Sequence, residues 1–182
     1  MSSLVISGDT SGQVTLAAPA VAGTTTITMP AVSGTMVVLP TTVSMVQLYT
    51  SNGQGSPNTA IRRFTNVLTN TGSDITYADS ATLGASFTIN TNGIYAINYS
   101  DQFNGSAQLG ISLNSAQGTT SIGSITDTNR IAYAIATAAN NNFMVSATLY
   151  LPSGSVIRPH TTNGTANGAA PNTATFLIVR VS

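Results

Sequence analysis

Residues 87–99 read FTINTNGIYAINY, and this stretch decides the expected fold. Its Thr, Ile, Phe and Tyr residues favour strands, and Asn-Gly tolerates the positive φ angles of a tight hairpin turn. After Asn92-Gly93, alternation places Tyr95, Ile97 and Tyr99 on one face of a strand. The stretch therefore predicts two antiparallel strands joined by a hairpin, one of which carries an aromatic face.

Similar short segments, separated by Pro, Gly, Asn and Ser, lie on both sides of this stretch. Further strands are expected at residues 43–50, 61–68, 74–77, 109–113, 131–136, 143–151, 156–157 and 176–181. The alanines of 131–136 also fit a helix, and Arg158–Thr173 is expected to be a long loop. Many short strands at this spacing predict an all-β, antiparallel jelly-roll sandwich.

The N-terminal segment contains only short β-rich runs. Pro19–Thr24 (PAVAGT) returns as Pro30–Thr35 (PAVSGT), and Pro, Ala and Gly breaks separate short β-rich runs. Three such runs cannot bury a core alone, so this segment needs a partner, and another copy of itself is the simplest one. Residues 1–42 are therefore expected to form an extended β-arm, and residues 43–182 to form the head domain.

The composition limits the classes of partner. The chain has 182 residues with five Arg, five Asp, one His and no Lys, Glu or Cys. Charged residues make up 5% of the chain, against about 25% in typical domains, and the net charge is zero. A neutral chain offers no basic surface for nucleic acid or an anionic membrane, so neither is expected as a partner. No apolar run approaches the ~20 residues of a membrane span, and the first residues do not resemble a secretory signal.

No catalytic constellation is visible. His160, the one histidine, lies in the expected loop, and no G-x-S-x-G motif accompanies it. The Asp residues are scattered, and none forms a calcium loop, so no metal and no cofactor are expected. Arg62-Arg63 is too small for a nucleic-acid patch and fits an ion pair or an interface contact better. A hydrolase is disfavoured, although an active site built from Asp residues of different subunits remains an alternative.

Residues 64–99 resemble the tumour-necrosis-factor-like jelly rolls, in particular complement-q-type globular heads. The resemblance rests on FTNVLTN at 64–70, DITY at 74–77, FTI at 87–89 and GIYAINY at 93–99, and it extends over about residues 44–182. It implies a compact homotrimer with strands facing the threefold axis. Ser155 stands where the family usually has an acid, so no calcium site is carried over.

Residues 12–39 resemble a segment common in fibre and decoration proteins of tailed bacteriophages. The pattern is G-x-V-T-L-x-A-P followed by G-T-x-T-I-T-x-P-x-x-x-G-T. The resemblance implies a non-enzymatic structural virion protein on the virion surface, whose partners are capsid or other virion proteins.

Three residue sets follow as candidates. The expected attachment residues of the arm are Leu4, Val5, Ile6, Val14 and Leu16. The expected trimer-packing residues are Met36, Val38, Tyr95, Tyr99 and Phe176, with the sandwich core as the alternative for the aromatic ones. A candidate ligand loop carries Arg158, His160, Asn163 and Asn167.

Two functions fit these candidates. The first is a trimeric capsid decoration or head-fibre protein anchored by its arm, whose strands pair with copies of themselves or with the capsid. The alternative is a tail-fibre tip that recognises a host surface glycan through the 158–173 loop. The short arm favours the first, because a tail fibre usually carries a long shaft.

Overall fold

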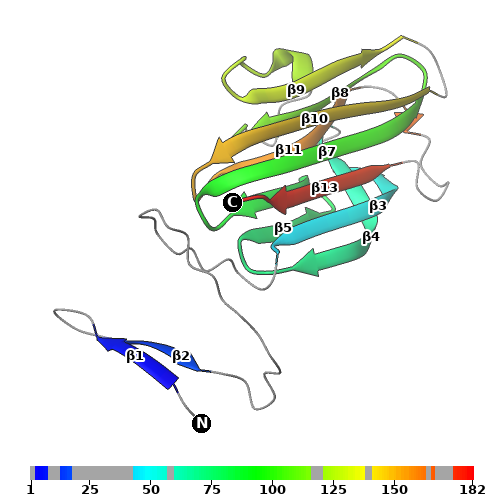
Figure 1. Cartoon of the computed structure of the whole chain (residues 1–182). Coiled ribbons are helices and arrows are strands. Elements are labelled where there is room, and N and C mark those ends of the chain that lie inside the picture. Colours follow the sequence, from blue (N-terminus) through cyan, green and yellow to red (C-terminus); the bar gives the residue numbers. More distant parts are fainter. Residues whose placement is uncertain are drawn as a thin grey trace. The chain divides into compact units, whose positions relative to one another are not determined.

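The computed structural model describes residues 3–7, 13–17, 43–56, 60–115, 121–137, 141–162, 165–166 and 174–182. The chain divides into two units, Met1–Leu39 and Pro40–Ser182. In the first unit, β1 (Ser3–Ser7) pairs antiparallel with β2 (Gln13–Ala17), and Leu4 lies opposite Leu16 (Figure 1). Both strands coincide with apolar runs of the expected arm; the runs at 25–29 and 36–39 lie outside the described residues.

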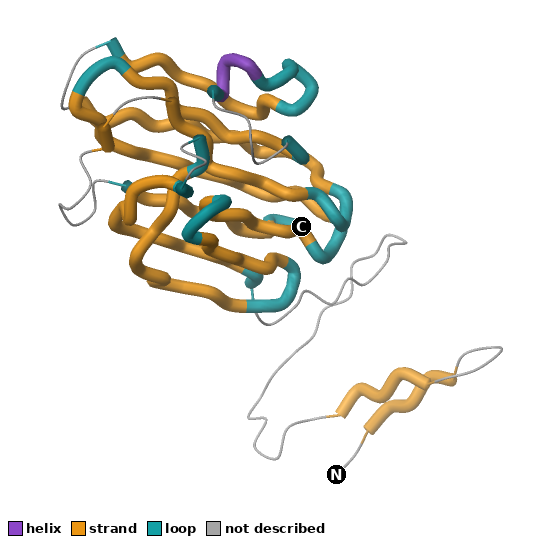
Figure 2. Tube along the Cα trace, turned by 180° about the vertical axis from the view of Figure 1, so that it is seen from behind, coloured by secondary structure: helices purple, strands orange, loops and turns teal. Residues whose placement is uncertain are grey.

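The second unit is a sandwich of two antiparallel sheets (Figures 1 and 2). The front sheet has the order β10-β7-β13-β3-β4, and the short β12 (Thr165–Ala166) also pairs with β7. Its strands are β10 (Asn141–Leu151), β7 (Gly93–Asn104), β13 (Thr175–Arg180), β3 (Met45–Gln54) and β4 (Arg62–Thr71). The back sheet has the order β5-β6-β11-β8-β9. Its strands are β5 (Ile75–Ser80), β6 (Gly84–Ile89), β11 (Val156–Thr162), β8 (Ala107–Leu113) and β9 (Arg130–Ala136). A single 3-10 turn, Ile122–Ser124, is the only helical element in the described residues, and no helix there is long enough to cross a membrane.

The core lies between the sheets and is aromatic at its centre. The Phe87 ring of β6 stacks on the Phe176 ring of β13 at 4.3 Å between centroids. Tyr95, Ile97 and Tyr99 share one face of β7, as the alternation predicts, and this face points inward, where all three are fully buried. The predicted all-β jelly-roll sandwich is confirmed.

The predicted hairpin at Asn92-Gly93 is wrong. β6 belongs to the back sheet and β7 to the front sheet, so the connection crosses from one sheet to the other. Neither Asn92 nor Gly93 has a positive φ. The Asn92 side chain instead accepts a hydrogen bond from the Ser153 amide at 2.7 Å. Gly93 is needed for close approach, because a Cβ there would lie 2.3 Å from the Ser182 carbonyl oxygen.

The predicted loop at 158–173 is also wrong in part, because β11 continues to Thr162 and Thr165–Ala166 form the short strand β12. Pro159 sits inside this strand opposite Ile111 of β8. The Thr161 amide donates to Ala60, away from β8, and alternation directs position 159 to the same side. Pro159 has no backbone N–H, but at this position β11 loses no hydrogen bond to β8, and the strand tolerates the proline.

Residues 131–136 form a strand rather than the alternative helix, and β10 alternates as expected. Its odd positions from Phe143 to Leu151 are buried or half-buried, and the described even positions are exposed. Arg62 and Arg63 point to opposite faces of β4 and pair with different acids, Asp101 and Asp79. Both arginines thus have the ion pairs that the sequence suggested.

Candidate functional site

Four neighbouring strands of the front sheet, β10, β7, β13 and β3, carry no charged side chain at the described positions of their outward face. We call this surface the front face. Cross-strand register aligns its outward residues in three rows. The rows are Tyr49–Thr175–Ser100–Met144, Gln47–Leu177–Asn98–Ser146 and Met45–Val179–Ala96–Thr148, and Ile94 pairs with Tyr150 beyond them.

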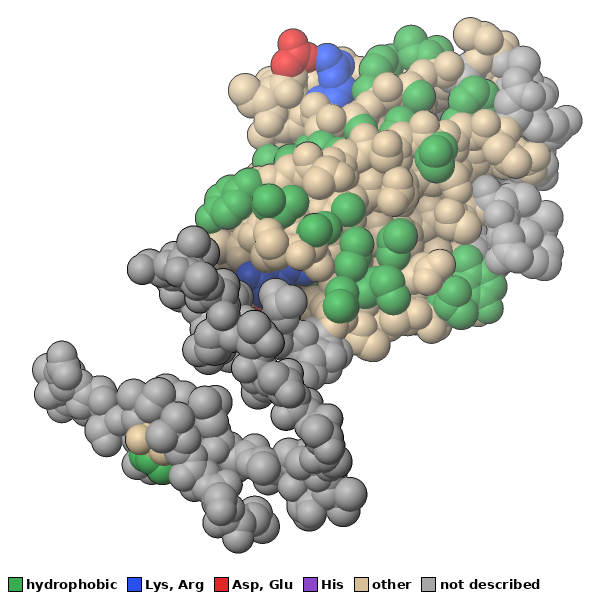
Figure 3. Space-filling view, viewed as in Figure 1, with side chains coloured by type: hydrophobic (Ala, Val, Ile, Leu, Met, Phe, Trp, Pro, Cys, Tyr) green, Lys and Arg blue, Asp and Glu red, His purple; other side chains and the backbone are tan. Residues whose placement is uncertain are grey.

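Several apolar side chains on the front face meet solvent. Met144 is 68% exposed, Tyr150 61% and Ile94 41%. Figure 3 views this side of the head: hydrophobic side chains are spread among uncharged polar ones, and charged side chains are visible only near the margins. A surface of this kind can be removed from water without stripping the hydration from an ion, which is the costly step in burying a charge.

A second apolar patch lies on β9, the edge strand of the back sheet. Tyr133 is 37% exposed and Ile135 57% exposed. Both lie on the side of β9 opposite to Ala132 and Ala134, which pack against the core. The Arg130 guanidinium lies 5.3 Å from the centre of the Tyr133 ring and also pairs with Asp127. The front face and the β9 edge are different surfaces, so a contact between them would join two copies head to tail.

The aromatic trimer-packing candidates do not lie on either surface. Tyr95, Tyr99 and Phe176 are fully buried in the core of a single chain, where they contact other core residues. The core alternative is therefore the correct one for these three side chains. Sequence alternation identified their strand face correctly but could not tell which face points inward. Met36 and Val38 lie outside the described residues.

The candidate ligand loop is not a loop at its first two positions. Arg158 and His160 are residues of β11, and His160 is fully buried, so it cannot contact a glycan. Asn163 and Asn167 lie outside the described residues. The remaining candidates, Leu4, Val5, Ile6, Val14 and Leu16, all belong to β1 and β2, and Val5 is 48% exposed.

His160 contacts a serine but does not complete a catalytic triad. Its Nε2 lies 3.2 Å from the Ser115 hydroxyl, and its Nδ1 has no partner within the described part of the chain. Burial, together with the nearby Arg158 charge, lowers the pKa of His160 to about 3, which makes it a weak base. No described acid orients the imidazole, and both side chains are buried. Among the described residues no group of His, Asp or Glu is arranged to hold a metal ion.

Comparison with known proteins shows the fold. The chain matches no protein-family model and no curated protein sequence. It is similar to crystal structures of murine APRIL at pH 8.0, 8.5 and 5.0, with TM-scores of 0.56, 0.53 and 0.52. The identities are 13%, 14% and 14%, and each match covers 76–77% of this chain and 99% of the other. At this identity the likeness is one of fold: the head is a jelly roll of the tumour-necrosis-factor type.

Proposed function

We propose that this chain is a non-enzymatic structural protein that assembles as a homotrimer on a bacteriophage virion surface, as a decoration or head-fibre protein. The observation that carries the assembly part is the front face, an exposed sheet surface without charge. The virion part rests on the resemblance of residues 12–39 to phage fibre and decoration proteins.

The trimer is supported by the presence of two unlike surfaces with exposed apolar side chains, the front face and the β9 edge. An edge-to-face contact between the β9 edge of one head and the front face of the next is heterologous, and such contacts form a ring when the rotation closes. The tumour-necrosis-factor-type fold of the head supports a ring of three members. In it, Ile135 and Tyr133 would lie against the apolar residues around Met144, which would be shielded from water.

Attachment is assigned to the arm. A two-stranded hairpin such as β1–β2 is marginally stable by itself, and its outer edges carry backbone groups that can pair with another strand. Pairing with copies of the arm or with capsid strands would supply those partners. Three arms on one trimer would also raise the effective concentration of each arm at neighbouring sites on the particle.

One experiment separates these parts. The full chain and a chain lacking residues 1–42 are examined by sedimentation velocity and then incubated with particles that lack the protein. We expect both to sediment as trimers and only the full chain to join particles. Normal incorporation of the truncated chain contradicts the role of the arm, and a monomeric full chain contradicts the trimer. Specific binding of the head to host cells would instead favour the tail-fibre tip.

A further inference from the structure

A polar cluster lies on the outward side of the back sheet, on the face opposite to the core. Arg158 and His160 are two positions apart on β11 and so point to the same side. Their cross-strand partners on β8 are Ser112 and Gly110. Two described residues beyond β8 cover them: the Ser115 side chain contacts His160, and the Ile122 side chain lies over Gly110.

Hydrogen bonds link most of the cluster. The Ser112 and Ser115 hydroxyl oxygens are 2.8 Å apart, and the Ser115 hydroxyl oxygen is 3.2 Å from His160 Nε2. Arg158 donates from Nη1 to the Ser115 carbonyl at 2.7 Å. The cluster therefore fixes the start of the β8–β9 connection on the sheet.

Two buried nitrogens in this cluster have no hydrogen-bond partner among the described residues, Arg158 Nε and His160 Nδ1. The pKa of His160, lowered to about 3, means that the imidazole is neutral and carries one N–H. When Nε2 accepts from the Ser115 hydroxyl, that N–H is on Nδ1. Both unpartnered atoms are then donors, so the group that the cluster lacks is an acceptor.

Arg158 also lacks a counter-charge. The other four arginines pair with Asp101, Asp79, Asp127 and Asp74, and within the described residues Arg158 is the one arginine without an acid. Desolvation alone lowers the pKa of its guanidinium. A water molecule could accept from both donors, but it would leave this half-buried positive charge uncompensated.

We propose that the cluster binds a small anion, such as chloride, which accepts hydrogen bonds from Arg158 Nε and His160 Nδ1. The site lies on the back sheet and not on the front face, so it does not depend on the proposed contact of the front face. Its ligand would hold the β8–β9 connection against the sheet.

The single histidine makes the test direct, because its imidazole nitrogen signals in NMR need no further assignment. Sodium chloride is titrated into the ¹⁵N-labelled full chain at constant ionic strength, with a bulky organic anion as the replacement. We expect the Nδ1–H tautomer and a saturable shift of the Nδ1 signal. The Nε2–H tautomer overturns the proposal. An Nδ1–H signal that does not shift when chloride is added also overturns it, since it would indicate a bound water.

Two variants of the full chain test whether Arg158 forms part of the anion site. Arg158→Met should abolish the saturable shift, whereas Arg130→Met, which removes a partly exposed arginine that is paired with Asp127, should leave it unchanged. If Arg158→Met does not fold, the wild-type titration alone still decides.

Discussion

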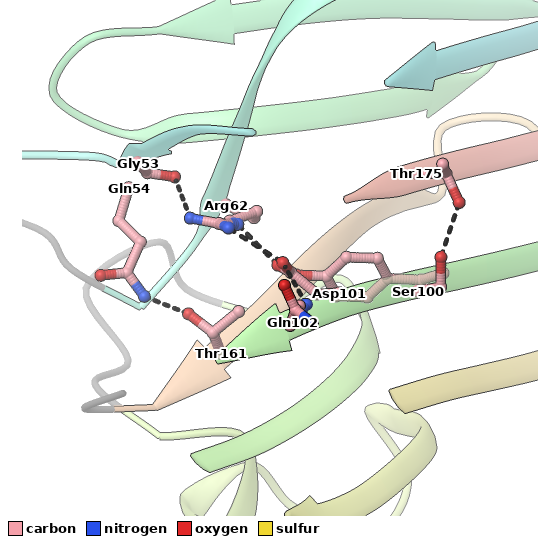
Figure 4. A network of polar contacts seen from close by, with 9 residues as sticks. Gly53, Gln54, Arg62, Ser100, Asp101, Gln102, Thr161 and Thr175 are labelled. Carbon is pink, nitrogen blue, oxygen red and sulfur yellow. Dashed lines mark hydrogen bonds and ion pairs between the residues drawn. The ribbon is translucent and has the colours of Figure 1, made fainter. Parts of the chain in front are cut away.

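Arg62 of β4 and Asp101 of β7 form a two-point ion pair in which both side chains are fully buried. Arg62 Nε donates to Asp101 Oδ2 at 2.6 Å and Nη2 donates to Oδ1 at 2.9 Å (Figure 4). The Tyr99 hydroxyl and the Gln102 amide also donate to this carboxylate, at 2.9 and 2.8 Å. Burial nevertheless raises the pKa of Asp101, against the opposing effect of Arg62. The pair thus links β4 to a strand that is not its neighbour.

Breaking this pair should be costly. Arg62→Met leaves the Asp101 carboxylate buried without its counter-charge, and removal of one partner of a buried pair typically costs about 3–5 kcal/mol. Urea unfolding measures the loss. Arg63→Met is the matched control, because its pair with Asp79 is partly exposed and such pairs contribute about 0–1 kcal/mol. Equal losses in the two variants would contradict the assignment.

The buried His160 should make stability depend on pH. Its pKa is about 3 in the folded chain, against the ordinary histidine value of 6.5 in the unfolded chain. Below pH 6.5 the unfolded chain therefore binds a proton that the folded chain does not, and the unfolding free energy should fall as the pH falls from 6.5 towards 3. At about 1.36 kcal/mol per pH unit, the loss between pH 7 and pH 5 is about 2 kcal/mol. His160→Gln should lack this loss when unfolding is measured at both values, and a parallel decline in the variant would exclude His160 as the cause.

The strands were predictable where one rule decides them. Alternation grouped the residues that share one face of β7 and of β10, because successive side chains of a strand point to opposite faces. Punctuation by Gly and Pro located most strand ends. These local features gave the jelly roll without any long-range information.

The errors arose where a contact distant in sequence decides. Asn92-Gly93 has the composition of a hairpin turn, but Ser153 and Ser182 determine its conformation. A proline is expected to break a strand, but the backbone of Pro159 faces away from β8, so its missing N–H removes no hydrogen bond between β11 and β8. The pairing of Arg62 with Asp101, 39 residues apart, has no local pattern at all. The front face could not be identified from sequence, because it requires knowing which strands are neighbours.

The role of Gly93 can be tested by adding one methyl group. In Gly93→Ala the new Cβ would meet the Ser182 carbonyl oxygen at 2.3 Å and Arg180 Nε at 2.7 Å, so the chain end must shift. Overpacking of this kind typically costs about 1–3 kcal/mol, measurable by thermal or urea unfolding. Deletion of Ser182 from the variant should recover part of the loss, since it removes the nearer contact. No recovery would contradict crowding as the cause.

Phe176 lies at the centre of the aromatic core. Its ring contacts those of Phe87, Phe64 and Tyr99, with centroids 4.3, 6.1 and 5.8 Å away. Phe176→Ala should cost about 3–5 kcal/mol, because it removes a buried aromatic ring and leaves a cavity. Tyr77→Ala, a partly buried residue that contacts Phe87 alone among the described rings, should cost less in the same unfolding assay. A larger loss of stability in Tyr77→Ala than in Phe176→Ala would mean that the core is not centred on Phe176.

The front face can be tested without disturbing the core. Met144 is 68% exposed in the single chain, so Met144→Lys should leave the monomer folded while placing a charge in the proposed contact. An uncompensated charge in a desolvated interface costs several kcal/mol, enough to dissociate a trimer at micromolar concentration. Leu83→Lys is the matched control: Leu83 is 43% exposed and lies in the β5–β6 turn, away from the front face. Sedimentation should show that the first variant is monomeric and the control trimeric. If Met144→Lys remains trimeric while Ile135→Lys dissociates, the β9 edge contacts a surface other than the front face, because a head-to-tail ring requires both halves of each contact.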